Sequence, residues 1–312
     1  MKPSVVESSR SRYAVGEFLA EGGMGAIYLG RRVEGDGPFA GDGGGEEVIL
    51  KALLPEYVQE QHFVDLFLRE ARLTAGLDHP NIVRTLDLVT GEDTYFIVME
   101  YVCGADLRTA QRRAKRRGRA LSPQTAIFAG LSILEALSYA HSRLQPDGVP
   151  LGLIHRDVSP SNILVGGDGC VKLSDFGIAK LSTHRSVFYK VKGKVGYMSP
   201  EQARGEPLDG RSDLFSLAVC VHEGLTGERL FAAMPMATAA ELYARPAPRP
   251  SERRPGIPHA IDAVMGKALD YDRTQRFQSA SEMRDALLRA AAVSGMLYRR
   301  EDMASHLADV LG

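Results

Sequence analysis

The sequence lacks the features that would assign it to a specialised class of protein. Its three cysteines, Cys103, Cys170 and Cys220, are scattered and form neither a disulfide framework nor a metal-binding cluster. No apolar run approaches the roughly 20 residues of a membrane-spanning helix, and the N-terminus has no signal-peptide core. A net charge of −1 gives no overall attraction to nucleic acid or anionic membranes. We therefore expect a cytoplasmic globular protein that neither binds nucleic acid nor spans a membrane.

The most informative stretch of the chain runs from residue 154 to residue 177. It contains two carboxylates and an amide, Asp157, Asn162 and Asp175. One carboxylate can accept a hydroxyl proton, while an amide oxygen and a second carboxylate are hard ligands for Mg²⁺. Two short apolar segments around the Gly-Gly-Asp-Gly turn at 166–169 predict a β-hairpin, which would bring Asn162 and Asp175 together. The stretch has what a Mg²⁺-dependent phosphoryl transfer needs.

The spacing of these residues resembles the catalytic motifs of eukaryotic-like serine/threonine protein kinases. His155-Arg-Asp-Val-Ser-Pro-Ser-Asn162 resembles the pattern H-R-D-L-x-x-x-N, and Asp175-Phe-Gly177 resembles D-F-G. The resemblance covers roughly residues 13 to 292 and is closest to bacterial members of the family. It implies an α+β, bilobal fold: a flexible N-terminus at 1–12, a small β-rich N-lobe with one helix at 13–102, a larger, mainly helical C-lobe at 103–292 and a C-terminal helical extension at 293–312.

The same resemblance implies a set of residues that bind ATP. Lys51 ends an apolar strand and Glu70 lies in the helical stretch 61–75, so that their pairing would hold Lys51 on the α- and β-phosphates. The backbone of Glu100 and Val102 would meet the adenine edge. The other implied nucleotide contacts are Glu21, Gly22, Gly23, Gly25 and Ile27 of a Gly-rich loop, Ile49, the gatekeeper Met99, Asp106 near the ribose, and Leu164.

The resemblance also assigns the catalytic roles, with two departures from the pattern. Asp157 would accept the proton of the substrate hydroxyl, and Asn162 and Asp175 would hold Mg²⁺. Ser159 stands where serine/threonine kinases usually have lysine, and Lys194 stands where the activation segment usually has threonine. We expect Lys194 to supply the cation that normally comes from the catalytic loop. The alternative is that Lys194 simply faces solvent.

Other motifs of the family predict supporting and regulatory roles. Asp213 resembles the buried helix aspartate that braces the catalytic loop, and Glu201 and Arg276 resemble a structural ion pair of the C-lobe. The candidate activation segment, 178–201, offers acceptors for autophosphorylation in Ser182, Thr183, Ser186 and Tyr189.

Other functions stay open at this point. A pseudokinase that binds nucleotide as a scaffold draws support from Ala20, Ser159 and Lys194, and Ser159 also removes the usual marker against tyrosine specificity. The protein-substrate motif at 196–201 speaks against a small-molecule kinase. In the C-terminal extension an apolar helix face, formed by Met303, Leu307, Val310 and Leu311, packs on its own lobe or offers a docking surface for a partner.

Overall fold

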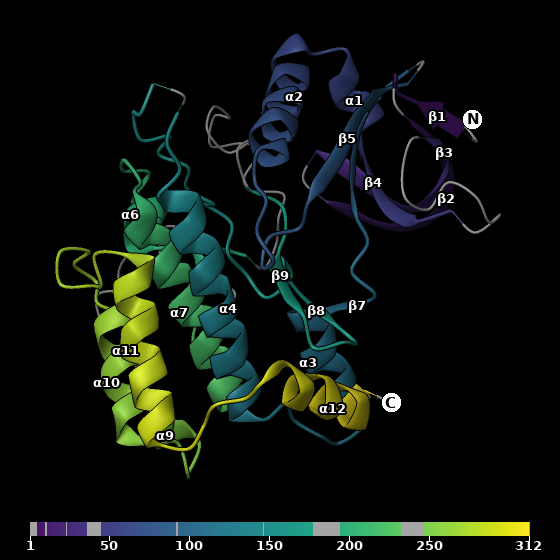
Figure 1. Ribbon diagram of the computed structural model, residues 1–312. Helices are drawn as coiled ribbons and strands as arrows, with labels where there is room; N and C mark the ends of the chain where they lie inside the picture. The colour runs from purple at the N-terminus through teal and green to yellow at the C-terminus, as the bar shows by residue number, and fades with distance from the viewer. Residues whose placement is uncertain are drawn as a thin grey trace. The chain divides into compact units, whose positions relative to one another are not determined.

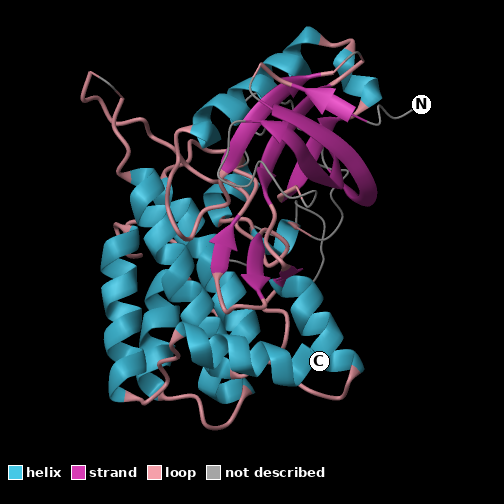
Figure 2. Cartoon of the chain, turned by 45° about the vertical axis from the view of Figure 1, so that its right-hand side comes forward, coloured by secondary structure: helices cyan, strands magenta, loops and turns pink. Residues whose placement is uncertain are grey.

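The computed structural model describes two compact units of the chain (Figures 1 and 2). The described residues are 5–9, 11–22, 24–35, 45–91, 93–145, 147–176, 194–231 and 246–311. We call the first unit, described residues up to His79 together with 83–101, the sheet unit, and the second, residues 80–82, 102–176 and 194–311, the helical unit. The chain passes from the sheet unit to the helical unit between residues 101 and 102, and the lobe boundary at residues 102 and 103 stays a prediction.

The sheet unit is built on a six-stranded antiparallel sheet with the order β1-β2-β3-β4-β6-β5. Side chains on its strands alternate between two apolar clusters: Phe96 and Val98 face one cluster, while Ile97 between them faces the other, which also contains Phe67 of α2. The elements are β1 (Val5–Glu7), β2 (Ser11–Gly22), β3 (Gly25–Gly35), β4 (Glu47–Leu53), α1 (Pro55–Val58), α2 (Gln61–Ala75), β5 (Thr85–Thr90) and β6 (Tyr95–Glu100).

The N-terminal strand β1 differs from the sequence expectation, which was a flexible stretch over residues 1–12. Val6 is buried in the same apolar cluster as Tyr13. The Tyr13 hydroxyl and the Ser8 hydroxyl both donate to Asp87 Oδ2, at 3.0 Å and 2.6 Å. A strand of only three residues gives almost no pattern in the sequence, and these tertiary contacts are what hold it in place.

The helical unit has its core between α4 (Pro123–His141) and α7 (Gly210–Thr226). Ser122 caps α4 by accepting from Thr125 N at 3.3 Å, and Pro123 occupies the first turn, where proline is favoured. The remaining elements are β7 (Gly104–Asp106), α3 (Leu107–Arg116), β8 (Ile163–Gly166), β9 (Val171–Leu173), the 3₁₀ turn η2 (Val195–Tyr197), α6 (Pro200–Arg204), α9 (Pro250–Arg253), α10 (His259–Ala268), α11 (Ala280–Val293) and α12 (Arg300–Leu311).

The C-terminal helix α12 packs on the helical unit itself, near α3 (Figure 1). Met303, Leu307 and Val310 on its apolar face are all buried. The sequence left two alternatives open for this face, packing on its own lobe or docking of a partner. The structure has the first, because the face is covered by the chain's own residues. No helix among the described residues combines the length and apolar character that crossing a bilayer requires.

Candidate active site

In the sheet unit, Lys51 and Glu70 form the ion pair that the sequence predicted. Lys51 lies on β4, and its Nζ is 2.6 Å from Oε1 of Glu70 on α2. Only 15% and 9% of the two side chains are exposed. A largely buried ammonium is costly without a partner. Glu70 therefore holds Lys51 in a defined position on the sheet.

The Gly-rich strands run next to this lysine. Gly22 pairs with Gly25 where β2 turns into β3, and Glu21, which is exposed, pairs with Ala26. Ile27 pairs with Lys51 across β3 and β4, and a Cβ on Gly25 would lie only 3.2 Å from Lys51 Cγ. The absence of a side chain at Gly25 thus keeps space beside Lys51. Gly23 and the stretch 177–193 lie outside the described residues.

The residues expected around the adenine and ribose are divided between the two units. Ile49 pairs with Met99 in the sheet unit, where Glu100 N donates to Arg84 O at 3.0 Å. In the helical unit, no backbone hydrogen bond of Val102 is present within the described ranges. Asp106 caps α3 by accepting from Thr109 N at 2.9 Å, and Leu164 pairs with it across β7 and β8. Nucleotide contacts at these positions remain predictions.

Asp157, Asn162 and Lys194 meet in one cluster of the helical unit. Lys194 Nζ lies 2.7 Å from Asp157 Oδ2 and 3.3 Å from Asn162 Oδ1. Asn162 Nδ2 donates to the same Asp157 oxygen at 3.0 Å and to the Asp157 carbonyl at 2.8 Å. Lys194 therefore does not merely face solvent, since 23% of its side chain is exposed and its ammonium group binds the predicted base.

Ser159, the other departure from the motif, lies in the same loop with only 1% of the residue exposed. Its hydroxyl is 3.0 Å from that of Ser161, and its carbonyl accepts from Asn162 N at 2.9 Å. Ser159 thus supports the loop from inside, and the cation of the cluster comes from Lys194.

The predicted hairpin brings the two proposed Mg²⁺ ligands to one end of β8 and β9. Ile163 begins β8 directly after Asn162, and β9 ends two residues before Asp175. Ser174 N donates to Asn162 O at 2.9 Å, which ties the two ends together. Asp175 has a left-handed backbone, with φ of 55°. An amide oxygen and a carboxylate fit Mg²⁺, which prefers hard oxygen ligands and completes its shell with water and phosphate oxygens.

Asp213 on α7 braces the loop that carries Asp157. It is buried and accepts from His155 N and Arg156 N, both at 2.8 Å. These bonds hold Arg156 in a left-handed conformation, with φ of 66°. Burial alone would raise the pKa of Asp213, but hydrogen bonding to His141 and the neighbouring N–H groups holds that pKa below its ordinary value.

Two histidines, His141 and His155, support the same loop and had no role assigned from the sequence. His141 Nε2 lies 2.9 Å from Asp213 Oδ2. The His155 ring links the loop to the end of the hairpin: Nδ1 accepts from Asp157 N at 3.2 Å, and Nε2 lies 3.0 Å from Ser174 O. His141 and Asp213 lie 72 residues apart in the sequence, and their contact is visible only in the tertiary fold.

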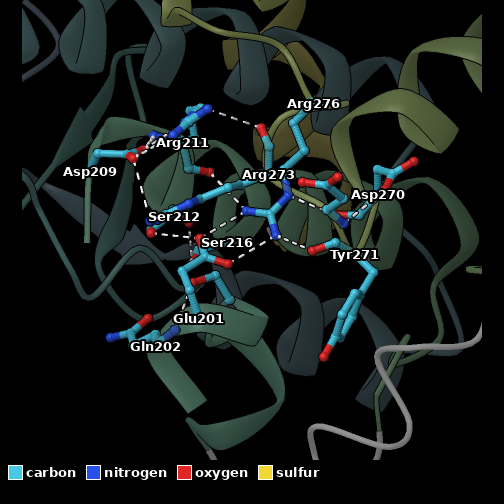
Figure 3. Close-up of polar contacts among 12 residues, drawn as sticks. Glu201, Gln202, Asp209, Arg211, Ser212, Ser216, Asp270, Tyr271, Arg273 and Arg276 are labelled. Atoms are coloured by element: carbon cyan, nitrogen blue, oxygen red, sulfur yellow. Dashed lines mark hydrogen bonds and ion pairs between the residues drawn. The ribbon is translucent and has the colours of Figure 1, made fainter. Parts of the chain in front are cut away.

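Further along the chain than Lys194, Glu201 of α6 and Arg276 form the predicted structural ion pair (Figure 3). Arg276 Nη1 and Nη2 donate to the two Glu201 oxygens, each at 2.9 Å, in an end-on bidentate pair. Arg276 also donates to the carbonyls of Asp270 and Tyr271, at 2.7 Å and 3.0 Å, and Ser212 Oγ donates to Glu201 at 2.7 Å. The pair anchors the segment that begins at Lys194 to the body of the helical unit.

The sequence is similar to a known family and to curated proteins of two bacteria. A family model described as "Protein kinase domain" matches residues 13–287. The chain is 37% identical over 281 residues to the tyrosine-protein kinase MasK of Myxococcus xanthus, covering 88% of this chain and 42% of the relative. It is 36% identical over 286 residues to the serine/threonine-protein kinase PknB of Mycobacterium leprae, covering 89% and 43%.

A structural likeness accompanies these sequence matches. The crystal structure of the Mycobacterium tuberculosis PknI kinase domain superimposes with a TM-score of 0.67 at 28% identity, covering 93% of this chain and 100% of that one. The chain spans less than half the length of the curated relatives named above.

Proposed function

This chain belongs to the protein kinase family, and on that premise we propose that it transfers the γ-phosphate of ATP to serine and threonine hydroxyls of protein substrates, itself included. The observation that carries the proposal is the cluster of Asp157, Asn162 and Lys194, in which a carboxylate is held in place by two donors. The three free cysteines suit a reducing compartment, and we propose the cytoplasm as the place of action.

Each charged group has a proposed task in the transfer. Lys51, fixed by Glu70, would bind the α- and β-phosphates. Asp157 would orient the acceptor hydroxyl and take its proton as the new bond to phosphorus forms. Mg²⁺ held by Asn162 and Asp175 would neutralise charge on the transferred group. The work of the protein is then mainly positioning and electrostatic stabilisation.

A scaffold that binds nucleotide without transferring phosphate is not supported. Its case rested on Ala20, Ser159 and Lys194. In the structure Lys194 binds the proposed base, and Ser159 supports the catalytic loop. Tyrosine as the acceptor is the second candidate, since one relative is named a tyrosine-protein kinase and Ser159 replaces the lysine that usually marks serine/threonine kinases.

The test is transfer of radiolabelled phosphate from ATP with Mg²⁺ to the chain itself and to a generic acceptor protein. Acid hydrolysis and separation of the phosphoamino acids then identify the acceptor. We expect phosphoserine and phosphothreonine. Phosphotyrosine alone would favour the second candidate, and label absent from both proteins, with the chain folded and nucleotide bound, would contradict the proposal.

Lys194→Ala should slow the transfer by roughly 10- to 100-fold, because a positioned cation stabilises the charge that develops on the phosphoryl group. Initial rates at saturating ATP measure this effect. Lys194→Arg keeps the charge and should restore part of the rate. Lys267→Ala, which removes a half-exposed lysine of α10, is the control for loss of any lysine in this unit. If Lys194→Ala matched the parent in rate, the assigned role would be wrong.

A further inference from the structure

The C-terminal helix α12 lies beyond residue 287, where the match to the family model ends. It nevertheless contacts the hairpin that connects the two proposed Mg²⁺ ligands. Arg300 Nε donates to the Asp168 carbonyl at 3.1 Å, and the Arg300 guanidinium also forms an ion pair with the Asp168 carboxylate. The Cys170 backbone N–H, and then Arg300, hold the pKa of Asp168 below its ordinary value, so the carboxylate is charged at neutral pH.

Gly169 allows this contact to be close. It is the left-handed residue of the β8–β9 turn, with φ of +81°. A Cβ at this position would overlap the Arg300 carbonyl oxygen and lie 3.0 Å from Ala304 N. The first turn of α12 therefore rests with its backbone directly on the tip of the hairpin, and only glycine leaves room for it.

The other side of α12 is anchored where α3 ends and α4 begins. His306 Nε2 accepts from Ser122 N at 3.0 Å, and the Ser122 hydroxyl donates to the Tyr298 hydroxyl at 3.1 Å. Arg119 Nη1 lies 3.2 Å from Asp309 Oδ1. The helix thus connects the tip of the β8–β9 hairpin to the start of the long core helix.

The hairpin is short, so that only a few residues separate its tip from the two proposed Mg²⁺ ligands. β8 begins at the residue after Asn162, and β9 ends two residues before Asp175. Each strand is three or four residues long, so that motion at the tip reaches both ligands. A single exposed ion pair contributes little to such a restraint. The buried face of α12 and the close backbone contact at Gly169 carry the larger share of the restraint.

We propose that α12 is a built-in brace of the active site, in which Arg300 and the helix backbone hold the Gly169 turn and thereby position Asn162 and Asp175 for Mg²⁺. The brace rests on the proposed function in so far as these two residues bind the metal. Arg300 is a positioning residue, because it acts through Asp168 and the hairpin.

The decisive variant is Gly169→Ala, which places a methyl group into the backbone of α12. Gly148→Ala is its matched control: Gly148 has a φ of +83°, and a Cβ there would meet nothing within 4 Å. Both variants carry the strain of a left-handed alanine. Only Gly169→Ala also pushes the helix away from the hairpin.

Two measurements are made on the full chain. Calorimetry with Mg²⁺ and a non-hydrolysable ATP analogue gives the affinity for the metal–nucleotide complex, and hydrogen exchange gives the protection of amides 163–176. We expect Gly169→Ala to weaken binding by on the order of tenfold and to speed exchange in the hairpin. Gly148→Ala should change neither. Arg300→Ala should weaken binding by roughly two- to fivefold, and Arg300→Lys should recover part of it.

The proposal is overturned if Gly169→Ala binds the complex as tightly as Gly148→Ala and protects the hairpin equally. Neither measurement depends on phosphate transfer. A parent chain that transfers no phosphate would therefore contradict the proposed function while leaving the brace to be judged by its own readouts.

Discussion

Asp157→Asn should reduce phosphate transfer by roughly 10²- to 10⁴-fold, the usual contribution of a positioned general base. Asparagine has nearly the shape of aspartate, so the hydrogen bond from Asn162 Nδ2, 3.0 Å long, can be kept through its amide oxygen. What is lost is the capacity to take the proton from the acceptor hydroxyl, together with the ion pair to Lys194. The rate constant for transfer should fall while nucleotide affinity changes little.

Initial rates at saturating ATP, with thermal stabilisation by Mg²⁺ and nucleotide as a parallel measure of binding, check this prediction. Asp285→Asn, which changes a half-exposed carboxylate on α11, is the matched control and should leave both values unchanged. A rate within a few-fold of the parent, in a variant that is folded and binds nucleotide, would remove Asp157 from the mechanism.

Much of this site was predictable because its residues belong to motifs of fixed order. The helix over 61–75, the hairpin after Asn162 and the pairing of Lys51 with Glu70 are all present as expected. In each case the local pattern and the chemistry agree: an apolar helix face, a Gly-rich turn, and a strand lysine that needs a partner. Lys194 is the most useful example, since a departure from the motif indicated where to look.

What could not be predicted depends on contacts between segments far apart in the sequence. β1 is three residues long, and its place is set by the burial of Val6 and the bonds to Asp87. In the same way, no sequence pattern near Gly169 indicates that the backbone of α12, which begins at residue 300, packs against it. A turn glycine with a positive φ is common, and whether another backbone lies against it is a property of the tertiary fold alone.

Arg276→Met should destabilise the helical unit by roughly 3–5 kcal/mol, because it leaves the Glu201 carboxylate buried without its counter-ion. The Arg276 and Glu201 side chains are 0% and 1% exposed, so water cannot replace the lost partner. A loss of this size is a large share of the total stability of a typical domain, and it should lower the melting temperature by on the order of 10 °C. Lys267→Met, which breaks a half-exposed ion pair with Glu282, is the control and should cost less than about 1 kcal/mol.

The pH dependence of this loss separates an unpaired charge from simple loss of packing. In the parent, burial raises the pKa of Glu201, but Arg276 outweighs it and holds that pKa below its ordinary value of 4.5. The carboxylate therefore stabilises the parent above pH 4.5, and this contribution is lost as the pH falls through the lowered pKa. In Arg276→Met the hydrogen bond from Ser212 remains, but the counter-ion that outweighed burial is gone. We expect burial to raise the pKa of Glu201 there, so that protonation begins to relieve the variant at a higher pH. Unfolding by denaturant should show the largest difference between parent and variant near pH 7 and a smaller one near pH 5. A difference that stays constant over this range would mean that the arginine matters only for the space it fills.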